Sequence, residues 1–177
     1  PDMSAELPIS VALVEDDEAM RARLAQVLGA APGIALTFAA TNAQQMLGWL
    51  QTNSVDVLLV DLGLPDRSGL EVIRWCRQNQ PGTDVMVVTM FGDESHMIRA
   101  FEAGARGYLV KSAASAELID AIRRVHKGQV YTQGEVKQHA EKTRAAVRRP
   151  RIPFSGRERQ VLALIAERVS GVPFHDL

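Results

Sequence analysis

The chain has 177 residues, of which 46% are hydrophobic and 23% charged, which is enough apolar material for one domain of ordinary size. Its single cysteine, Cys76, excludes an internal disulfide framework and a cysteine-based metal site. No apolar run approaches the roughly 18 residues of a membrane span, and no signal peptide opens the sequence, so we expect a cytoplasmic protein without a membrane partner. Residues 1–136 carry a net charge of −6 and residues 137–177 one of +5, which suggests two modules with different partners.

Five strand-then-helix units follow one another between residues 8 and 128. Short apolar runs that are typical of strands cover residues 9–14, 34–40, 57–60, 85–89 and 107–110. Apolar residues at helical spacing follow these runs, over about 18–28, 43–50, 69–80, 93–103 and 118–125. Strands that alternate with helices in this way predict right-handed crossovers and a parallel sheet with helices on both faces. We therefore expect an α/β domain with a doubly wound, five-stranded parallel sheet.

The sequence changes character after residue 128. Residues 129–153 are polar and basic and end in a stretch rich in arginine and proline, so they predict a linker. At Ser155 a capping box with Glu158 opens a new amphipathic pattern. Residues 154–177 therefore predict the start of a second, helical domain.

Polar side chains stand where the predicted strands end, and in a parallel sheet these ends meet at one edge. Three acids at 15–17 follow the first strand, Asp61 follows the third, Thr89 ends the fourth, and Lys111 follows the fifth. Carboxylates this close repel one another unless a cation is present, and Mg²⁺ suits them because it prefers oxygen ligands and keeps positions open for phosphoryl oxygens. A lysine ammonium can balance further negative charge, and a threonine hydroxyl can hydrogen-bond a group attached to Asp61. Together these residues predict phosphoryl transfer to Asp61.

Four motifs, taken as a set, resemble the receiver domain of bacterial two-component response regulators over residues 8–128. They are Val-Glu-Asp-Asp at 14–17, Asp-Leu-Gly-Leu-Pro-Asp-Arg-Ser-Gly at 61–69, Val-Val-Thr-Met at 87–90 and Gly-Tyr-Leu-Val-Lys-Ser at 107–112. The resemblance implies a flavodoxin-like fold with strand order 2-1-3-4-5. It also implies a phosphorylated switch protein, served by a sensor histidine kinase, rather than an enzyme.

The same resemblance implies a role for each residue of the site. Asp61 would accept the phosphoryl group, and Thr89 and Lys111 would contact its oxygens. Tyr108 would be the aromatic that, with Thr89, switches on activation by turning inward. The Mg²⁺ ligands, bound directly or through water, would be Glu15, Asp16, Asp61 and the backbone carbonyl of Gly63.

Two departures from the family pattern carry predictions of their own. Many receivers have a proline after the lysine, often with a cis bond, whereas Ser112 stands here and predicts a trans bond. Phe91 and Gly63, two residues beyond Thr89 and Asp61, offer no polar side chain that could orient an attacking water. We therefore expect a long-lived aspartyl phosphate.

Residues 154–167 resemble the first helix of the NarL/LuxR-type (FixJ-like) DNA-binding domain. The resemblance implies a transcription regulator that binds DNA through a complete C-terminal domain and forms a homodimer when phosphorylated. The recognition helix of that domain does not appear in the 177 residues, so no DNA-binding residue is assigned. We expect this chain by itself to make only salt-sensitive phosphate contacts with DNA.

Other functions fit the sequence less well. A stand-alone receiver, acting as a protein-interaction switch or phosphorelay intermediate, would use the same site without a DNA-binding output. A Mg²⁺-dependent hydrolase with two aspartates spaced by one residue lacks its second aspartate, because Gly63 stands there. A nucleotide-binding enzyme is disfavoured because no glycine-rich turn follows the first strand.

Overall fold

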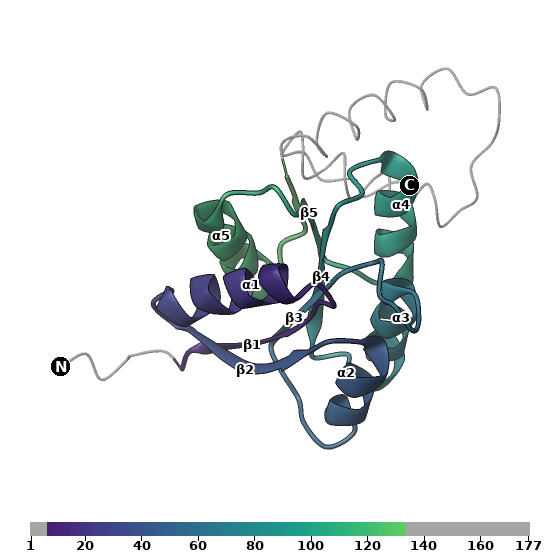
Figure 1. The fold of residues 1–177 in the computed structure, drawn as a ribbon, viewed down its shortest axis with the longest axis horizontal. Coiled ribbons are helices and arrows are strands. Elements are labelled where there is room, and N and C mark those ends of the chain that lie inside the picture. The colour runs from purple at the N-terminus through teal and green to yellow at the C-terminus, as the bar shows by residue number, and fades with distance from the viewer. Residues whose placement is uncertain (1–6, 134–177) are drawn as a thin grey trace.

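The computed structural model describes residues 7–133, and within them a single parallel sheet carries the fold (Figure 1). Its strands lie in the order β2-β1-β3-β4-β5-β6, and all five neighbouring pairs are parallel. The strands are β1 (Ile9–Val14), β2 (Ile34–Ala40), β3 (Val57–Val60), β4 (Asp84–Thr89), β5 (Gly107–Val110) and β6 (Tyr131–Thr132). The helices are α1 (Glu18–Ala30), α2 (Ala43–Leu50), α3 (Gly69–Asn79), α4 (Glu94–Ala103) and α5 (Ser115–His126). The predicted doubly wound fold and the order of its first five strands are confirmed.

The sheet separates two apolar cores (Figure 1). On one face α1 and α5 pack over Val11, Leu13 and Leu59, and on the other α2, α3 and α4 cover residues of the opposite alternation, among them Ala12 and Leu58. Because the central strands are buried on both faces, they have continuous apolar sequences instead of alternating ones. Among the described residues, no helix is long and apolar enough to cross a membrane.

Four of the five described helices have an N-cap side chain from the loop that precedes them. Asp17, Asn42, Ser68 and Asp93 each accept a hydrogen bond from a backbone N–H in the first turn of α1, α2, α3 and α4. Such caps satisfy donors that have no partner within the helix. Each of these helices therefore starts directly beside the carboxyl edge of the sheet, where the preceding strand has just ended.

The sheet continues one strand beyond the five that the sequence predicts. Residues 129–133, expected in the linker, lie along β5: Tyr131 N–H donates to the Arg106 carbonyl, and the Gln133 side chain accepts from Val110 N–H. Tyr131 also donates its hydroxyl to Glu117 of α5. A strand of two residues is too short to produce an alternating pattern, which is why the sequence gives no signal for it.

Two further expectations concern the backbone and the tail. No cis peptide bond occurs in the described part of the chain, so the bond between Lys111 and Ser112 is trans, as predicted. The predicted remainder of the linker, 134–153, and the predicted helical segment, 154–177, lie outside the described residues. They remain predictions.

Candidate functional site

The carboxyl ends of four parallel strands bring the predicted site residues to one edge of the sheet. Val14 lies opposite Val60, Val60 opposite Val87, and Thr89 opposite Val110, so the residues that follow these positions emerge side by side. Glu15 and Asp61 are both buried, at 2% and 6% exposure. The strands that precede these carboxylates are apolar and buried on both faces, so moving them toward solvent would expose apolar side chains. The carboxylates are therefore fixed at the edge of the sheet.

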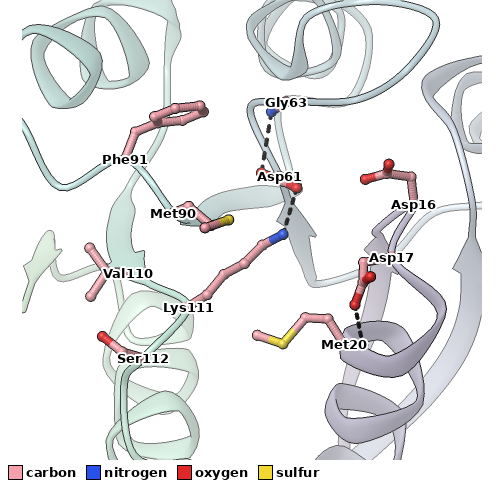
Figure 2. Close-up of a pocket in the computed structure, with 10 residues that line it drawn as sticks. All are labelled: Asp16, Asp17, Met20, Asp61, Gly63, Met90, Phe91, Val110, Lys111 and Ser112. Atoms are coloured by element: carbon pink, nitrogen blue, oxygen red, sulfur yellow. Dashed lines mark hydrogen bonds and ion pairs between the residues drawn. The ribbon is translucent and has the colours of Figure 1, made fainter.

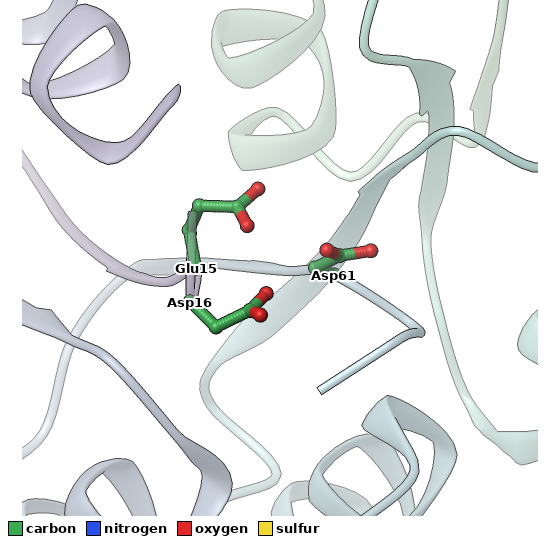
Figure 3. Close-up of side chains that lie close together, drawn as sticks. All are labelled: Glu15, Asp16 and Asp61. Atoms are coloured by element: carbon green, nitrogen blue, oxygen red, sulfur yellow. The ribbon is translucent and has the colours of Figure 1, made fainter. Parts of the chain in front are cut away.

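Three carboxylates and one ammonium form the centre of the site. Oxygens of Glu15, Asp16 and Asp61 all lie within 4.8 Å of one another, and Figure 3 shows the three side chains converging. The Lys111 ammonium lies 2.8 Å from Glu15 Oε1 and 2.9 Å from Asp61 Oδ2. With all three acids ionised, one ammonium leaves two negative charges uncompensated.

The three neighbouring acids at 15–17 have different surroundings. Glu15 receives both the Lys111 ammonium and the Asp17 backbone N–H, the latter at 3.0 Å. Asp17 caps α1 by accepting from Met20 N–H. Asp16 is exposed, and Figure 2 shows its carboxylate beside the cavity. Of the three acids, Asp16 is therefore the one that is exposed at the site and does not cap a helix.

Burial and charge act in opposite directions on the ionisable groups. Burial raises the pKa of the Glu15 carboxyl above its usual range, although the hydrogen bond from Lys111 lowers it. Burial alone would lower the pKa of the Lys111 ammonium, but hydrogen bonds to Glu15 and Asp61 more than offset this and raise it. Lys111 therefore stays positively charged at neutral pH.

An open cavity of about 710 Å³ lies over this centre (Figure 2). Asp16, Asp17 and Met20 line one side of the cavity, and Met90, Phe91 and Val110 line the side across Lys111. Its full lining consists of Asp16, Asp17, Met20, Asp61, Gly63, Met90, Phe91, Val110, Lys111 and Ser112. The cavity is large enough to admit a phosphoryl group together with part of its donor.

Thr89 and Tyr108 both hydrogen-bond to the backbone of Phe91, a residue that lines the cavity. The buried Thr89 hydroxyl accepts a 3.4 Å hydrogen bond from Phe91 N–H, and the Tyr108 hydroxyl donates to the Phe91 carbonyl. The Tyr108 ring is fully buried and packs near Phe101 of α4. Burial raises the pKa of Tyr108, and the negative charges of Asp93 and Asp61 raise it further, so the phenol stays a donor.

The structure brings together all the site residues that the sequence predicts, although not in equal contact. The cavity is lined by Asp61, Asp16, Gly63 and Lys111, whereas Glu15 is buried next to it. Thr89 and Tyr108 do not line the cavity but hydrogen-bond to the backbone of Phe91, which does. The sequence gives little signal for the apolar residues that line the cavity, Met20, Met90 and Phe91. Met20, three residues after the capping Asp17, has helical spacing as its only signal, and Met90 directly follows a strand.

Comparisons with known proteins agree with this geometry. Residues 11–123 match the family described as "Response regulator receiver domain". The chain is 32% identical to the response regulator UvrY of Escherichia coli over 162 residues, covering 90% of this chain and 74% of UvrY. It is 30% identical to the response regulator GacA of Pseudomonas aeruginosa, covering 89% of this chain and 75% of GacA. A LuxR-family two-component response regulator from Aurantimonas superimposes with a TM-score of 0.74 at 28% identity, covering 78% of this chain and 99% of that one.

Proposed function

This chain belongs to the response regulator receiver family, and from that premise we propose that Asp61 accepts a phosphoryl group from a sensor histidine kinase. The observation that carries the proposal is the contact of one ammonium, Lys111, with Asp61 and Glu15 beside a third carboxylate. An aspartate held in this way is paired with an ammonium and lines the cavity. Such a group can act as a nucleophile toward phosphorus.

The proposed metal is Mg²⁺, and the donor set fits it. The residues that would hold it are Glu15, Asp16, Asp61 and the Gly63 carbonyl, all oxygen donors. Because Lys111 already occupies one oxygen of Glu15, we expect Asp16 and Asp61 to be direct ligands and Glu15 to act through water. The two uncompensated charges of the cluster match a divalent cation. When bound, the metal would neutralise and orient phosphoryl oxygens.

The proposed step is an in-line displacement at phosphorus. An Asp61 carboxylate oxygen attacks, an O–P bond forms, and the bond from phosphorus to the donor imidazole nitrogen breaks, leaving its electron pair on that nitrogen. The Lys111 ammonium lies 2.9 Å from Asp61 Oδ2, which is close enough for it to contact an oxygen of a phosphoryl group attached to Asp61. The role of Lys111 is thus to stabilise charge before and after the transfer.

We assign the switch to Thr89 and Tyr108. To reach a phosphoryl oxygen, the Thr89 hydroxyl has to leave the Phe91 N–H that it now accepts from. Phe91 would then be held by Tyr108 alone on its polar side. The β4–α4 loop would change position as a result, and the change would be read by a partner surface.

The proposed aspartyl phosphate is long-lived because neither Gly63 nor Phe91 offers a polar side chain that could orient an attacking water. The Phe91 ring lies over Gly63, 3.7 Å from where a Cβ of that glycine would stand. The ring also stacks on His96, with centroids 4.5 Å apart, which keeps it in this position. Dephosphorylation within seconds, in the absence of a phosphatase, would contradict this part of the proposal.

The proposed output is control of transcription through a LuxR-type DNA-binding domain, with dimerisation on phosphorylation. Support comes from the similarity to the LuxR-family response regulator from Aurantimonas and from the resemblance of residues 154–167 to the first helix of that domain. A gel shift of the 177-residue chain should give only salt-sensitive binding. Salt-resistant, sequence-specific binding would contradict the prediction that these 177 residues contain no recognition helix.

The decisive experiment compares wild type with Asp61→Asn. Each is incubated with Mg²⁺ and acetyl phosphate, and intact mass spectrometry measures the added phosphoryl group. We expect a single acid-stable, hydroxylamine-sensitive adduct on the wild type and none on the variant, with none on either protein when EDTA removes the metal. An adduct on Asp61→Asn would overturn the central assignment.

A further inference from the structure

Helix α2 is capped twice, once by its own chain and once by the loop that follows Asp61. Asn42, the residue before α2, accepts from Gln45 N–H at 2.8 Å. Asp66, 22 residues beyond Gln44, accepts from Ala43 N–H through Oδ1 and from Gln44 N–H through Oδ2, both at 2.9 Å. All three first-turn donors of α2 are therefore satisfied, two of them by a carboxylate from the β3–α3 loop.

The bidentate contact is electrostatically favourable. A carboxylate at a helix N-terminus meets backbone N–H groups and the positive end of the helix dipole. Burial opposes the charge on Asp66, but backbone hydrogen bonds, first those from the Ala43 and Gln44 amides, together outweigh it and lower the pKa of this carboxyl. Asp66 therefore stays ionised, and the contact persists over the whole neutral range.

The loop that carries Asp66 also carries Gly63. Its two ends are fixed: Leu62 and Leu64 are buried in the core on the α2 side of the sheet, and Gly63 pairs with Ser68 across the turn. Gly63 N–H donates to Asp61 Oδ1 at 3.2 Å, so the turn starts directly at the phosphoacceptor. Asp66 fixes the tip of this turn against a separate helix.

We infer that Asp66 is a positioning residue of the phosphoacceptor site, which sets the Gly63 backbone by holding the 63–68 turn against the N-terminus of α2. The inference rests on the proposed function, because Gly63 matters as a carbonyl donor to Mg²⁺. The Gly63–Ser68 bridge ties the two ends of the turn together, so we expect a shift at its tip to reach Gly63. Asp66 touches neither the metal nor the phosphoryl group.

The chain provides a matched control for this inference. Asn42 caps the same helix with a hydrogen bond of similar length, but that bond joins two residues of the α2 segment and does not involve the 63–68 turn. Asn42→Ala and Asp66→Ala both weaken the first turn of α2. Only Asp66→Ala releases the turn that begins beside Asp61.

The experiment measures the rate of phosphorylation by acetyl phosphate across a Mg²⁺ titration, with the whole 177-residue chain. For Asp66→Ala we expect the half-saturating Mg²⁺ concentration to rise about three- to tenfold, with the rate at saturating Mg²⁺ nearly unchanged. This rise is at or below the smallest loss of metal affinity that is typical when a residue supporting a metal ligand is replaced. Asp66→Asn, which keeps one acceptor and loses the charge, should fall between. In spectra recorded with Mg²⁺ alone, the Gly63 amide should respond at correspondingly higher concentrations in the variants.

Two results would overturn the inference. The first is an unchanged Mg²⁺ midpoint in Asp66→Ala, whether or not the saturating rate falls. The second is an equal rise of the midpoint in Asn42→Ala, which would assign the effect to the helix. Failure of the proposed function is distinguishable, because it would show as a wild type that is not phosphorylated on Asp61 at any Mg²⁺ concentration.

Discussion

Two loops border the cavity over Asp61, and they are held by different means. In the β3–α3 loop, Leu62 and Leu64 are buried, at 7% and 9% exposure, and backbone pairing joins Gly63 to Ser68. In the β4–α4 loop, Met90 and Phe91 are exposed to 76% and 43%. Side-chain hydroxyls and ring stacking hold Phe91 there, in place of backbone pairing.

This difference suits the two loops to different tasks. Moving the β3–α3 loop requires buried leucines to leave the core and a backbone bridge to break, which makes it a stable frame for a metal ligand. Moving the β4–α4 loop requires only that the Thr89 and Tyr108 hydroxyls change partners, each a contact of about 1 kcal/mol net. The first loop is therefore built to hold the site, and the second to respond to it.

The largest expected effect comes from Gly69→Ala, at the end of the β3–α3 loop. A Cβ at this position would overlap the Asp61 carbonyl oxygen and lie 2.9 Å from Leu62 Cα, and both of those atoms belong to the backbone. Because neither can yield without moving the loop, we expect a loss of about 3 kcal/mol of unfolding free energy, the upper part of the range for overpacking. Urea unfolding, followed by tryptophan fluorescence, measures it.

Gly82→Ala is the control for that substitution, because a Cβ there would meet no atom within 4 Å. It should change the unfolding free energy by less than about 1 kcal/mol. If Gly69→Ala were as mild as Gly82→Ala, the β3–α3 loop would be able to shift, and the distinction between a fixed and a responsive loop would fail.

A second effect concerns the chemistry of the responsive loop. Replacing Phe91 with Gln introduces a side chain that can orient water beside Asp61, so we expect dephosphorylation to be about tenfold faster, a small part of what a positioned acid–base group contributes. Phe91→Leu removes the stacking on His96 but stays apolar. Decay of the wild-type and variant phosphoproteins is followed by intact mass. Equal acceleration in both variants would show that shape and not polarity controls the lifetime.

Much of this fold and site is predictable from the sequence because local signals and tertiary neighbours coincide. Apolar runs give the strands, and in a parallel sheet their carboxyl ends lie at one edge, where the Lys111 side chain reaches Glu15 and Asp61. The trans bond before Ser112 follows from the residue type. These predictions need no knowledge of how side chains pack.

The features that the sequence did not reveal depend on contacts between distant segments. β6 has two residues and exists because the β5 edge offers it partners, including Val110 N–H for the Gln133 side chain. The contact of Asp66 with α2 depends on where the loop tip lands. The buried position of the Tyr108 ring depends on packing around it, and alternation along β5 places it on a face without selecting its rotamer.

Tyr108→Phe tests the hold on the responsive loop with a smaller effect. The ring remains, and only the hydroxyl that donates to the Phe91 carbonyl is lost, so we expect a cost of about 1 kcal/mol. Amide exchange should increase at residues 90–93 and stay unchanged at residues 62–68. An equal increase in both loops would show that Tyr108 supports the site as a whole, and the contrast between the loops would be lost.

The smallest expected effect compares one carboxylate from each loop, Asp66 and Asp93. Burial opposes the charge of both, but hydrogen bonds lower the pKa of each below its ordinary value of 3.8: Ala43 and Gln44 amides for Asp66, and the His96 ring and amide for Asp93. A carboxyl with a lowered folded-state pKa stabilises the fold above its ordinary pKa. That contribution is lost as the pH falls below 3.8 through the folded-state value.

Salt should separate these two contributions. The Asp93–His96 contact is an exposed pair, with side chains 50% and 40% accessible, and a Coulomb interaction with His96 is one of the causes that lower the pKa of Asp93. At about 1 M NaCl, where charges are screened beyond roughly 3 Å, the difference in melting temperature between wild type and Asp93→Asn should shrink at mildly acidic pH. The difference for Asp66→Asn should persist, because its partners are backbone amides in direct contact. If salt reduced the two differences equally, the helix dipole of α2 would stabilise the Asp66 carboxylate more than its two hydrogen bonds do. The tip of the β3–α3 loop would then be less firmly anchored than its geometry indicates.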